Sequence, residues 1–345
     1  MGQRSPDSLR ALADARGITM GAAVASEQIH NDPELRDTIL AEFAAVVPEW
    51  EMKWATVRKE RGQFQVAGAD AIAQFARQNC LRMRGHPLIW HSAMPPWVAN
   101  EIGNGHAMQM MESHIQATVT RFSDVVHSWD VVNEAVQPED KLDAKLRNSP
   151  WLRAIGPAYI DLAFRLAHQA DPRARLVYND YNVEYDASKA EAILALIKGL
   201  RDRGVPIDAV GLQSHLWVSR RRLRPETLRN FCRNVTREGL DILITELDVR
   251  ESDYSLAPAV RDAKVAAVAK EYLEIVFSEV TPKEVTFWGV SDRYSWLSKP
   301  SFNPENPDGH LNRGLPFDTN MKRKPIWQVT RDVIAAVPQA KEKMS

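Results

Sequence analysis

The chain has 345 residues, of which 44% are hydrophobic and 26% charged, so it is long enough to bury one large core. Its 44 basic and 45 acidic residues give a formal net charge of -1. This balance argues against a nucleic-acid-binding or membrane-surface protein, because both classes need a basic excess. We therefore expect a neutral substrate, and neither a nucleic acid nor a membrane as partner.

Helical and strand-like segments alternate along the whole chain, which is typical of α/β folds with a parallel sheet. An opening helix is predicted over about residues 5–17, with Ser5 as N-cap, Pro6 in the first turn and Gly17 just past its end. Amphipathic helices follow between the strands, for example over residues 160–167, which are apolar at helical spacing. Eight runs rich in β-branched residues are the predicted strands: Ile18–Val24, Ala44–Val47, Leu81–Gly85, Val125–Val132, Leu176–Tyr178, Ala209–Leu212, Ile242–Thr245 and Val285–Trp288.

Eight such strands could form either an open doubly wound sheet or a closed barrel. In an open sheet the fourth and seventh strands would stand at least about 14 Å apart, at roughly 4.8 Å per strand, too far for their carboxylates to act on one bond. Closure brings all the C-terminal strand ends to one face. We therefore predict one domain over residues 1–345, a single (β/α)8 barrel over about residues 18–335, with its site at that face.

Polar or aromatic residues follow seven of the predicted strands, at the end where the site is expected. They are Glu49 and Lys53, His86 and His91, Asn133 and Glu134, Asn179 and Asp180, Gln213 and His215, Glu246 and Asp248, and Trp288.

Two of these residues, Glu134 and Glu246, are the candidate catalytic groups. Each follows an apolar β-run, where a charge would cost several kcal/mol unless it opened onto a site. Hydrolysis of a glycosidic bond needs such a pair. One carboxyl group protonates the leaving oxygen, while the other attacks, or activates water, on the opposite side of the sugar. The pair therefore indicates a glycosidase.

Neighbouring polar residues are expected to separate the two roles. Asp248 lies two residues beyond Glu246, so both side chains point the same way on an extended strand. His215, from the neighbouring strand end, is placed to bridge them, and its positive charge would keep Glu246 ionised as a nucleophile. The negative charge on Glu246 would favour the protonated form of Glu134. Asn133 is placed to hydrogen-bond a substrate hydroxyl beside the reacting carbon.

Seven motifs occur in the order of a known family: Glu51 to Trp54, Arg84 to His91, Trp129 to Ala135, Tyr178 to Asn182, Gly211 to His215, Thr245 to Asp248, and Trp288 to Asp292. From about Ile18 to about Val333 the chain thereby resembles glycoside hydrolase family 10, whose best-known members are retaining endo-β-1,4-xylanases. The resemblance implies that Glu134 is the acid/base and Glu246 the nucleophile. It implies that Glu49 and Lys53 bind the next sugar on the non-reducing side, and that the subsite of the cleaved sugar is lined by His86, Trp90, Asn133, Gln213, His215, Trp288 and Trp296.

The chain departs from the family pattern at two positions. The family usually has Glu-Asn where this chain has Glu49-Trp50, and Trp-His-Ser-Gln where this chain has Trp90-His91-Ser92-Ala93. Both missing residues normally contact the sugar in the second glycone subsite. Trp50 and Ala93 therefore predict that this subsite is reshaped or closed. The other interpretation is that Trp50 stacks on a sugar or packs aside.

Three functions remain open on the sequence. The first is an endo-acting β-1,4-xylanase on xylan or xylo-oligosaccharides. The second is an exo-acting or short-substrate β-xyloside hydrolase whose second glycone subsite is blocked by Trp50. The third, a noncatalytic carbohydrate-binding barrel, is disfavoured because both glutamates are present. We expect a monomer without cofactor, and no metal, because His86 and His91 lack metal-ligand spacing.

An arginine-rich loop follows the His215 strand, with Arg220, Arg221, Arg222 and Arg224. It is interpreted either as a solvated basic loop or as a contact for an acidic sugar decoration such as a glucuronyl group.

Cys80 and Cys232 are too few and too far apart for a disulfide framework, so we expect free, buried thiols. No apolar run approaches the roughly 20 residues of a membrane span. Residues Met1 to Ser8 lack the apolar core of a secretory signal. The compartment stays open between the cytoplasm and a secreted or periplasmic location with the signal removed.

Overall fold

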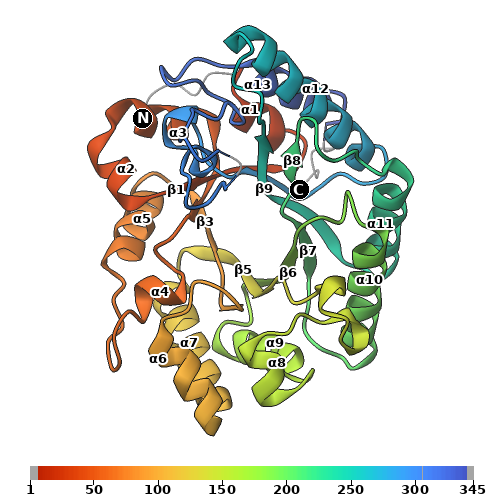
Figure 1. Ribbon diagram of the computed structural model, residues 1–345. Coiled ribbons are helices and arrows are strands. Elements are labelled where there is room, and N and C mark those ends of the chain that lie inside the picture. Colours follow the sequence, from red (N-terminus) through yellow and green to blue (C-terminus); the bar gives the residue numbers. More distant parts are fainter. Residues whose placement is uncertain (1–6, 305, 340–345) are drawn as a thin grey trace, which may run out of the picture.

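The computed structural model describes residues 7–304 and 306–339 (Figure 1). Eight parallel strands follow one another around a closed barrel, in which the last strand pairs with both the first strand and its own predecessor. The predicted (β/α)8 barrel is confirmed. Its strands are β1 (Thr19–Val24), β2 (Ala45–Pro48), β3 (Arg82–Gly85), β5 (Val126–Asn133), β6 (Arg175–Asp180), β7 (Ala209–Leu212), β9 (Asp241–Arg250) and β10 (Glu284–Phe287).

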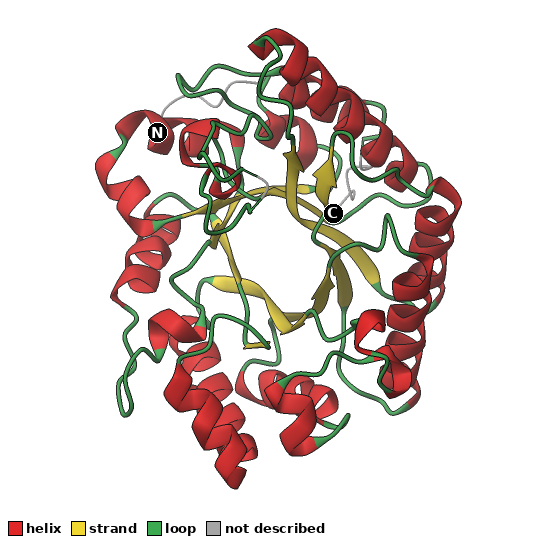
Figure 2. Cartoon of the chain, in the orientation of Figure 1, coloured by secondary structure: helices red, strands yellow, loops and turns green. Residues whose placement is uncertain are grey.

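Helices form a ring outside the strands (Figure 2). Their apolar faces pack on the barrel, as on the helix over residues 159–170, where Ile160, Ala163, Phe164 and Ala167 are all buried. The helices are α1 (Leu9–Asp14), α2 (Ser26–Asn31), α3 (Pro33–Glu42), α4 (Trp54–Val57), α5 (Ala67–Gln78), α6 (Pro96–Glu101), α7 (Ala107–Phe122), α8 (Pro150–Ile155), α9 (Tyr159–Ala170), α10 (Ala187–Asp202), α11 (Pro225–Arg237), α12 (Pro258–Phe277) and α13 (Pro325–Ala335).

The opening helix is shorter than predicted. The proposed cap residues Ser5 and Pro6 lie outside the described residues, and α1 begins at Leu9. Its N-cap is Ser8, whose Oγ accepts a hydrogen bond from the backbone N–H of Ala11 at 3.1 Å. A serine oxygen that satisfies a free N–H of the first turn fixes where a helix starts. The prediction therefore chose the wrong one of two nearby serines.

Two short strands extend the sheet above the barrel at the end where the site lies. β4 (Ile89–Trp90) pairs with the end of β5, and β8 (His215–Trp217) pairs with the end of β9. Between β7 and β8, Ser214 has a φ of 62°, which turns the chain before it re-enters the sheet. Its Oγ hydrogen-bonds Tyr272 Oη at 2.5 Å, which anchors this turn to α12.

Small residues on some strands make room for large ones on their neighbours inside the barrel. A Cβ atom at Gly85 of β3 would lie 2.0 Å from Trp129 Cε3 of β5, closer than any real contact. A Cβ atom at Gly21 of β1 would lie 2.4 Å from Thr286 Oγ1 of β10. The interior is therefore filled by side chains, as in other barrels of this class.

The cysteine prediction was half right. Cys232 on α11 is a buried free thiol, whereas Cys80, also free, is exposed. Cys80 follows the end of α5 and has a φ of 53°, so it belongs to a surface turn rather than to a helix face.

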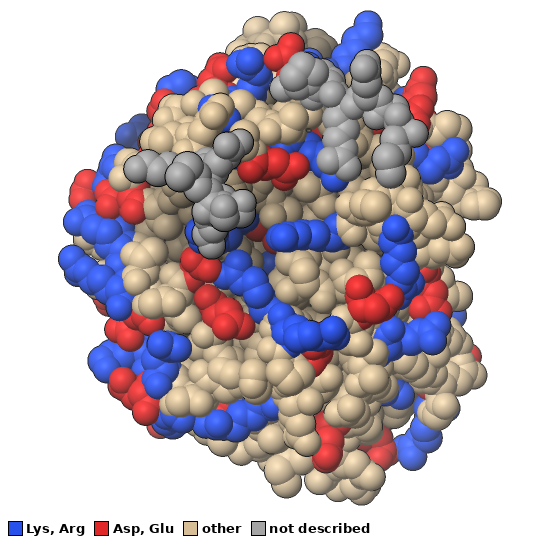
Figure 3. Space-filling model, turned by 180° about the vertical axis from the view of Figure 1, so that it is seen from behind, with Lys and Arg blue, Asp and Glu red and all other residues tan. Residues whose placement is uncertain are grey.

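Surface charge is mixed, as the near-zero net charge suggests. Seen from behind, acidic and basic side chains are interspersed over the surface (Figure 3). None of the described helices is both long enough and apolar enough to cross a membrane.

Candidate active site

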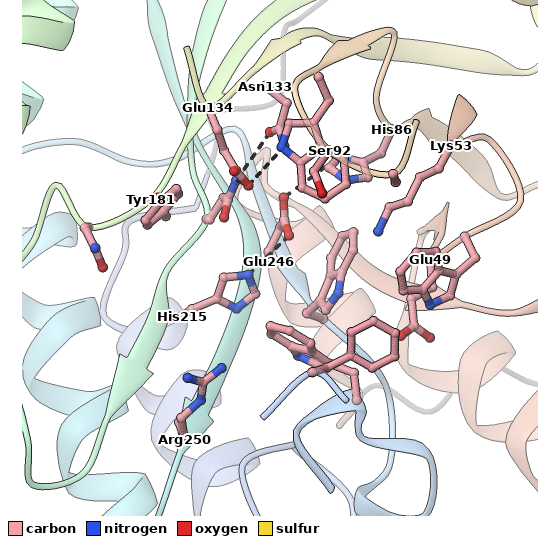
Figure 4. Close-up of a pocket in the computed structure, with 18 of the residues that line it drawn as sticks. Glu49, Lys53, His86, Ser92, Asn133, Glu134, Tyr181, His215, Glu246 and Arg250 are labelled. Carbon is pink, nitrogen blue, oxygen red and sulfur yellow. Dashed lines mark hydrogen bonds and ion pairs between the residues drawn. The ribbon is translucent and has the colours of Figure 1, made fainter. Parts of the chain in front are cut away.

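A cavity of about 470 Å³ opens where the barrel strands end. Figure 4 shows Glu134 and Glu246 pointing into it, with Glu49 and Lys53 on one side and Tyr181 on the other. Asp248 is not one of the residues that line the cavity, but it contacts His215. The other predicted site residues line the cavity: Glu49, Trp50, Lys53, His86, Trp90, Ala93, Asn133, Glu134, Gln213, His215, Glu246, Trp288 and Trp296.

Glu246 is surrounded by cations and hydrogen-bond donors. Its Oε1 accepts a hydrogen bond from Asn179 Nδ2 at 2.7 Å, and its Oε2 lies 3.3 Å from His215 Nε2. His86 Nδ1 lies 3.8 Å from Oε1. Burial alone would raise the pKa of Glu246, but the charges of His86, His215 and Lys53 lower it to about 2. This carboxylate is therefore ionised at ordinary working pH.

Asp248 and Trp296 hold the ring of His215 in place. His215 Nδ1 lies 2.8 Å from Asp248 Oδ1, and Trp296 Nε1 donates a hydrogen bond to Asp248 Oδ2 at 2.6 Å. Burial disfavours a charged imidazole, but Asp248 and Glu246 outweigh burial and raise the pKa of His215 to about 10. His215 is thus a charged bridge between two carboxylates.

Glu134 lies among neutral groups instead. Its Oε1 accepts hydrogen bonds from Gln213 Nε2 at 3.1 Å and from Asn133 Nδ2 at 3.2 Å. Its Oε2 lies 3.8 Å from His91 Nδ1, and burial is the main cause that lowers the pKa of His91 to about 4. This imidazole is therefore neutral at higher pH. The side chain of Glu134 is 13% exposed, compared with 6% for Glu246.

The backbone at Glu134 adopts an uncommon conformation, with a φ of 58°. Its N–H donates to the carbonyl of Asn179 on β6 at 2.9 Å, and its carbonyl accepts from Arg147 Nε at 2.7 Å. Positive φ in a residue other than glycine persists only when the surrounding contacts fix it, and such residues concentrate at functional sites. These two hydrogen bonds fix the direction in which the Glu134 side chain leaves β5.

A buried charge network lies beneath the cavity. Arg84 Nη2 donates to Asp130 Oδ1, and His86 Nδ1 lies 2.9 Å from Asp130 Oδ2. Ligand atoms of His86, Asp130 and Glu246 come within 4.8 Å of one another, which is close enough for a shared cation. However, the guanidinium of Arg84 already neutralises Asp130, and Lys53 adds a positive charge near Glu246. The donor set therefore favours a hydrogen-bonded network over a metal site.

Three indoles surround the ammonium of Lys53. Its Nζ lies 4.0 Å from the ring centroid of Trp50, 5.2 Å from that of Trp90 and 5.7 Å from that of Trp288. Burial lowers the pKa of Lys53 and raises the pKa of the nearby Glu49. Both residues are more than 90% buried and line the cavity, so they add polar groups to an otherwise aromatic wall.

Trp50 contacts an aromatic residue from the last long loop. Its ring centroid lies 5.2 Å from that of Phe302, and Phe302 lies 6.3 Å from Trp296. The Ala93 carbonyl accepts a hydrogen bond from Ala55 N–H at 2.7 Å, which fixes the loop opposite. Trp50 therefore lines the cavity and lies close to both Lys53 and Phe302.

Comparison with known proteins agrees with this geometry. The family model for Glycosyl hydrolase family 10 matches residues 8–333. The chain belongs to glycosyl hydrolase family 10. Endo-1,4-beta-xylanase 1 of Humicola insolens is 36% identical over 336 residues, which cover 95% of this chain and 74% of the relative. Endo-1,4-beta-xylanase B of Thermotoga neapolitana is 33% identical over 331 residues, 94% of this chain and 91% of that protein.

Solved structures of family 10 members have the same fold. Native xylanase 10B from Thermotoga maritima superimposes with a TM-score of 0.84 at 33% identity, covering 95% of this chain and 98% of that chain. Xylanase 10B from Thermotoga petrophila RKU-1, solved in complex with xylobiose, superimposes with a TM-score of 0.84 at 32% identity. The match covers 96% of this chain and 98% of that chain. Membership in this family makes the protein a glycoside hydrolase.

Several residues of this family 10 site were not among the predicted site residues. They are Ser92, Tyr181, Asn182, Trp217, Arg250 and Phe302, which line the cavity, and Asn179, which holds Glu246. Arg221, which the sequence analysis named in the arginine-rich loop, also lines the cavity. Asn179, Tyr181 and Asn182 belong to one of the recognised motifs, so their position after β6 was the available signal. Phe302 lies in an irregular loop, where no periodic pattern shows which way a side chain points.

Proposed function

We propose that this family 10 glycoside hydrolase is a retaining endo-β-1,4-xylanase, with Glu134 as general acid/base and Glu246 as nucleophile. The supporting observation is the contrast between two carboxyl groups that face one cavity. Cations favour the ionised form of Glu246, whereas Glu134 accepts hydrogen bonds from two neutral amides. Two carboxyl groups with opposite surroundings are what double displacement at a sugar requires.

In this mechanism the Glu246 carboxylate attacks the anomeric carbon while the glycosidic C–O bond breaks. Glu134 gives its proton to the departing oxygen, which leaves with the reducing-end fragment. Water then attacks the same carbon and transfers a proton to Glu134, and the Glu246 carboxylate is released. Two inversions leave the configuration unchanged. Asn133 and Gln213 are placed to position Glu134 and a sugar hydroxyl.

The cavity also suits a neutral sugar chain. Trp90, Trp288 and Trp296 offer flat faces for C–H groups, while Lys53 and Glu49 offer a hydrogen-bond donor and acceptor for hydroxyls. The relatives named above are endo-1,4-beta-xylanases, and one neighbour was solved with xylobiose, which supports xylan or xylo-oligosaccharides as substrate. As expected from the sequence, we also propose a single-domain, monomeric enzyme.

The test compares Glu246→Ala and Glu134→Ala on aryl β-xylosides with good and poor leaving groups. Glu246→Ala should abolish turnover of both, because the covalent step is lost. Glu134→Ala should spare the first step only for the good leaving group, which needs no proton. NMR of the first product should show the β-anomer. The exposed Glu191→Ala on α10 is the control for loss of a glutamate.

Two results would overturn the assignment. An α-anomer as first product would mean inversion, which requires a wider separation of the carboxyl groups. Equal loss of Glu134→Ala activity on both leaving groups would mean that the roles are misassigned.

A second candidate is a short-substrate hydrolase with a closed second glycone subsite. The contact of Trp50 with Phe302, with the Lys53 ammonium at 4.0 Å from the same indole, favours it, because both contacts take up indole surface that could otherwise stack on a sugar. Ala93 also lacks an amide that could bind that sugar. Little binding energy from a remote sugar would then be available to accelerate the reaction.

This candidate predicts little gain in kcat/KM from an aryl xyloside to the xylobioside with the same leaving group. Trp50→Asn combined with Ala93→Gln should restore the gain, and Phe302→Ala should restore part of it by freeing the other side of the indole. If the parent already prefers the xylobioside by several hundredfold, roughly 3 to 4 kcal/mol, the subsite is open and the ordinary endo-xylanase stands.

A further inference from the structure

The loop between β5 and α8 leaves the barrel just after Glu134 and then returns beside it. Backbone hydrogen bonds join the outgoing and returning parts of this loop. The N–H of Gln137 donates to the carbonyl of Lys145 at 2.8 Å, and the N–H of Arg147 donates to the carbonyl of Ala135 at 2.7 Å. The return of the loop therefore brings the side chain of Arg147 next to the backbone of the proposed acid/base.

The guanidinium of Arg147 donates hydrogen bonds to three neutral oxygens. Its Nε donates to the carbonyl of Glu134 at 2.7 Å. Its Nη2 donates to Tyr181 Oη at 2.8 Å and to Gln137 Oε1 at 2.9 Å. Tyr181 Oη in turn donates to the same Gln137 oxygen at 3.1 Å. Because a guanidinium is planar and its donors point in fixed directions, these bonds hold the three acceptors in one relative arrangement.

This arrangement connects the backbone of Glu134 to the wall of the cavity. Tyr181 lines the cavity across from Lys53 (Figure 4), whereas the half-buried Arg147 is not one of the lining residues. The ring of Tyr181 is also held from α10, since Lys189 Nζ lies 3.5 Å from its centroid and 2.7 Å from Asp180 Oδ1. Arg147 thus reaches a fixed part of the wall without facing the substrate itself.

Glu134 depends on such support because its φ of 58° is disfavoured for a residue with a side chain. Its N–H is held by the carbonyl of Asn179 at 2.9 Å, and its carbonyl is held by Arg147. Loss of the guanidinium would allow the peptide that follows Glu134 to rotate. A general acid must lie within hydrogen-bond reach of the oxygen that it protonates, and a displacement of about 1 Å can cost about a hundredfold in rate.

The charge of Arg147 also affects His91, whose Nδ1 lies 3.8 Å from the Glu134 carboxylate. Burial is the main cause that lowers the pKa of His91 to about 4, and the charge of Arg147 is the next. Arg147 therefore helps to keep this neighbour of Glu134 neutral.

We propose that Arg147 is a positioning residue that aims Glu134 at the oxygen of the departing fragment by fixing its backbone relative to Tyr181. This rests on the proposed role of Glu134 as acid/base, and it adds a residue that does not touch the substrate. The planar guanidinium is suited to this task because it binds three oxygens at once in fixed directions, whereas the ammonium of a lysine is a point charge on a flexible stem.

The test compares Arg147→Met with the parent on dinitrophenyl and phenyl β-xylosides, which have a good and a poor leaving group. Arg147→Met should lower kcat/KM for the phenyl xyloside by between about tenfold and a hundredfold, and should change it by at most about twofold for the dinitrophenyl xyloside, whose leaving group needs no proton. Titration of active sites with a fluorinated xyloside that traps the covalent intermediate corrects for misfolded protein. A merely structural role would lower kcat/KM equally for both substrates.

Tyr181→Phe is a milder second variant, because it removes one acceptor of the guanidinium and keeps the ring. It should show the same selective loss on the phenyl xyloside, at smaller size. The control is Arg153→Met on α8. Arg153 also donates to a backbone carbonyl, that of Asn148 at 3.0 Å, but it is exposed and does not line the cavity. This variant should behave as the parent on both substrates.

Equal loss on both substrates per active site in Arg147→Met, or no loss on the phenyl xyloside, overturns the inference. If Arg147→Met does not fold, Tyr181→Phe decides, and a kcat/KM for the phenyl xyloside equal to that of the parent overturns the inference. Glu134→Ala separates this failure from that of the proposed function. When Glu134→Ala shows the selective loss and Arg147→Met does not, the inference fails alone. When Glu134→Ala itself loses equally on both substrates, the proposed roles fail and the inference fails with them.

Discussion

At the scale of single residues, the charge of Glu246 depends on His215. Burial disfavours a carboxylate, and the pKa of Glu246 is nevertheless lowered to about 2 because cationic neighbours favour its ionised form. His215 is one of those neighbours, and Asp248 keeps it charged. The ionisation of the proposed nucleophile is therefore maintained by a residue that has no covalent role in the proposed mechanism.

His215→Asn should raise the pKa of Glu246, because a positive charge that favours the ionised form is lost. In a plot of kcat/KM against pH, the acid limb should move to higher pH by about one unit or more. An aryl xyloside with a good leaving group is the substrate of choice, since proton donation by Glu134 then does not limit the rate.

The matched control is His127→Asn. His127 also pairs with a buried glutamate, Glu284, at 3.1 Å, but at the start of the strands rather than at the site. Its replacement should leave the acid limb in place. An acid limb that stays fixed in His215→Asn would show that other cations control Glu246.

Side chains that follow strands were predictable from the sequence, and so was the bridge of His215 between Glu246 and Asp248. The partners of side chains inside the strands were not. Glu134, His215 and Glu246 stand out because polar groups interrupt apolar strands at the expected end. Asp130 lies inside the apolar strand itself, and its pairing with Arg84 depends on which strands become neighbours. A pattern along one strand contains no information on the side chains that face it from another.

At the scale of elements, α10 carries two ion pairs in very different surroundings. Lys189 in its first turn reaches Asp180 at the end of β6, with Nζ to Oδ1 at 2.7 Å and both side chains at most 3% exposed. Lys198 pairs with Asp202 on the outer face, where both side chains are 61% exposed. The first pair connects the helix to the barrel, and the second remains in water.

Lys189→Ala should lower the free energy of unfolding by about 3 kcal/mol or more, because Asp180 would be left as a buried, unpaired charge. Lys198→Ala, on the same helix, should leave the stability close to that of the parent, because exposed pairs are screened by water and salt. Chemical denaturation of the three proteins measures both effects. Similar stabilities for the two variants would contradict the prediction.

All eight barrel strands were predicted from short runs along the chain, most of which contain β-branched residues, usually to within a few residues. The two short strands β4 and β8 were not, because strands of two and three residues are too short to show a period. They form only because β5 and β9 continue past the barrel and offer free backbone groups for pairing. Their existence is therefore a consequence of tertiary structure.

At the scale of the whole molecule, buried ionisable groups limit stability on both sides of a pH window. The pKa values of Glu246 and Glu284 are lowered to about 2 from an ordinary 4.5, so their stabilising contribution is lost as pH falls below 4.5. The pKa of His215 is raised to about 10 from 6.5, so its contribution is lost as pH rises above 6.5. Between these limits two other groups have opposite effects on stability. The raised pKa of Glu184 makes stability fall as pH rises, whereas the lowered pKa of His91 makes stability increase as pH rises.

The melting temperature should therefore be nearly constant between about pH 4.5 and 6.5 and should fall on either side. Thermal unfolding at constant ionic strength measures it. In Asp248→Asn the alkaline decline should be smaller, because His215 loses the partner that raises its pKa, while the acid decline from Glu284 should persist. A flat profile from pH 6.5 to 9 in the parent would refute this account.

The glycine at position 85 has a consequence for how this barrel can diverge. A Cβ atom there would overlap the Trp129 ring, so an alanine at 85 is acceptable only after the indole has been replaced by something smaller. That indole belongs to β5, which leads directly to Glu134, so shrinking it first would loosen the support of the proposed acid/base. Neither single step is neutral, and the two positions are expected to change together or not at all among descendants of this sequence.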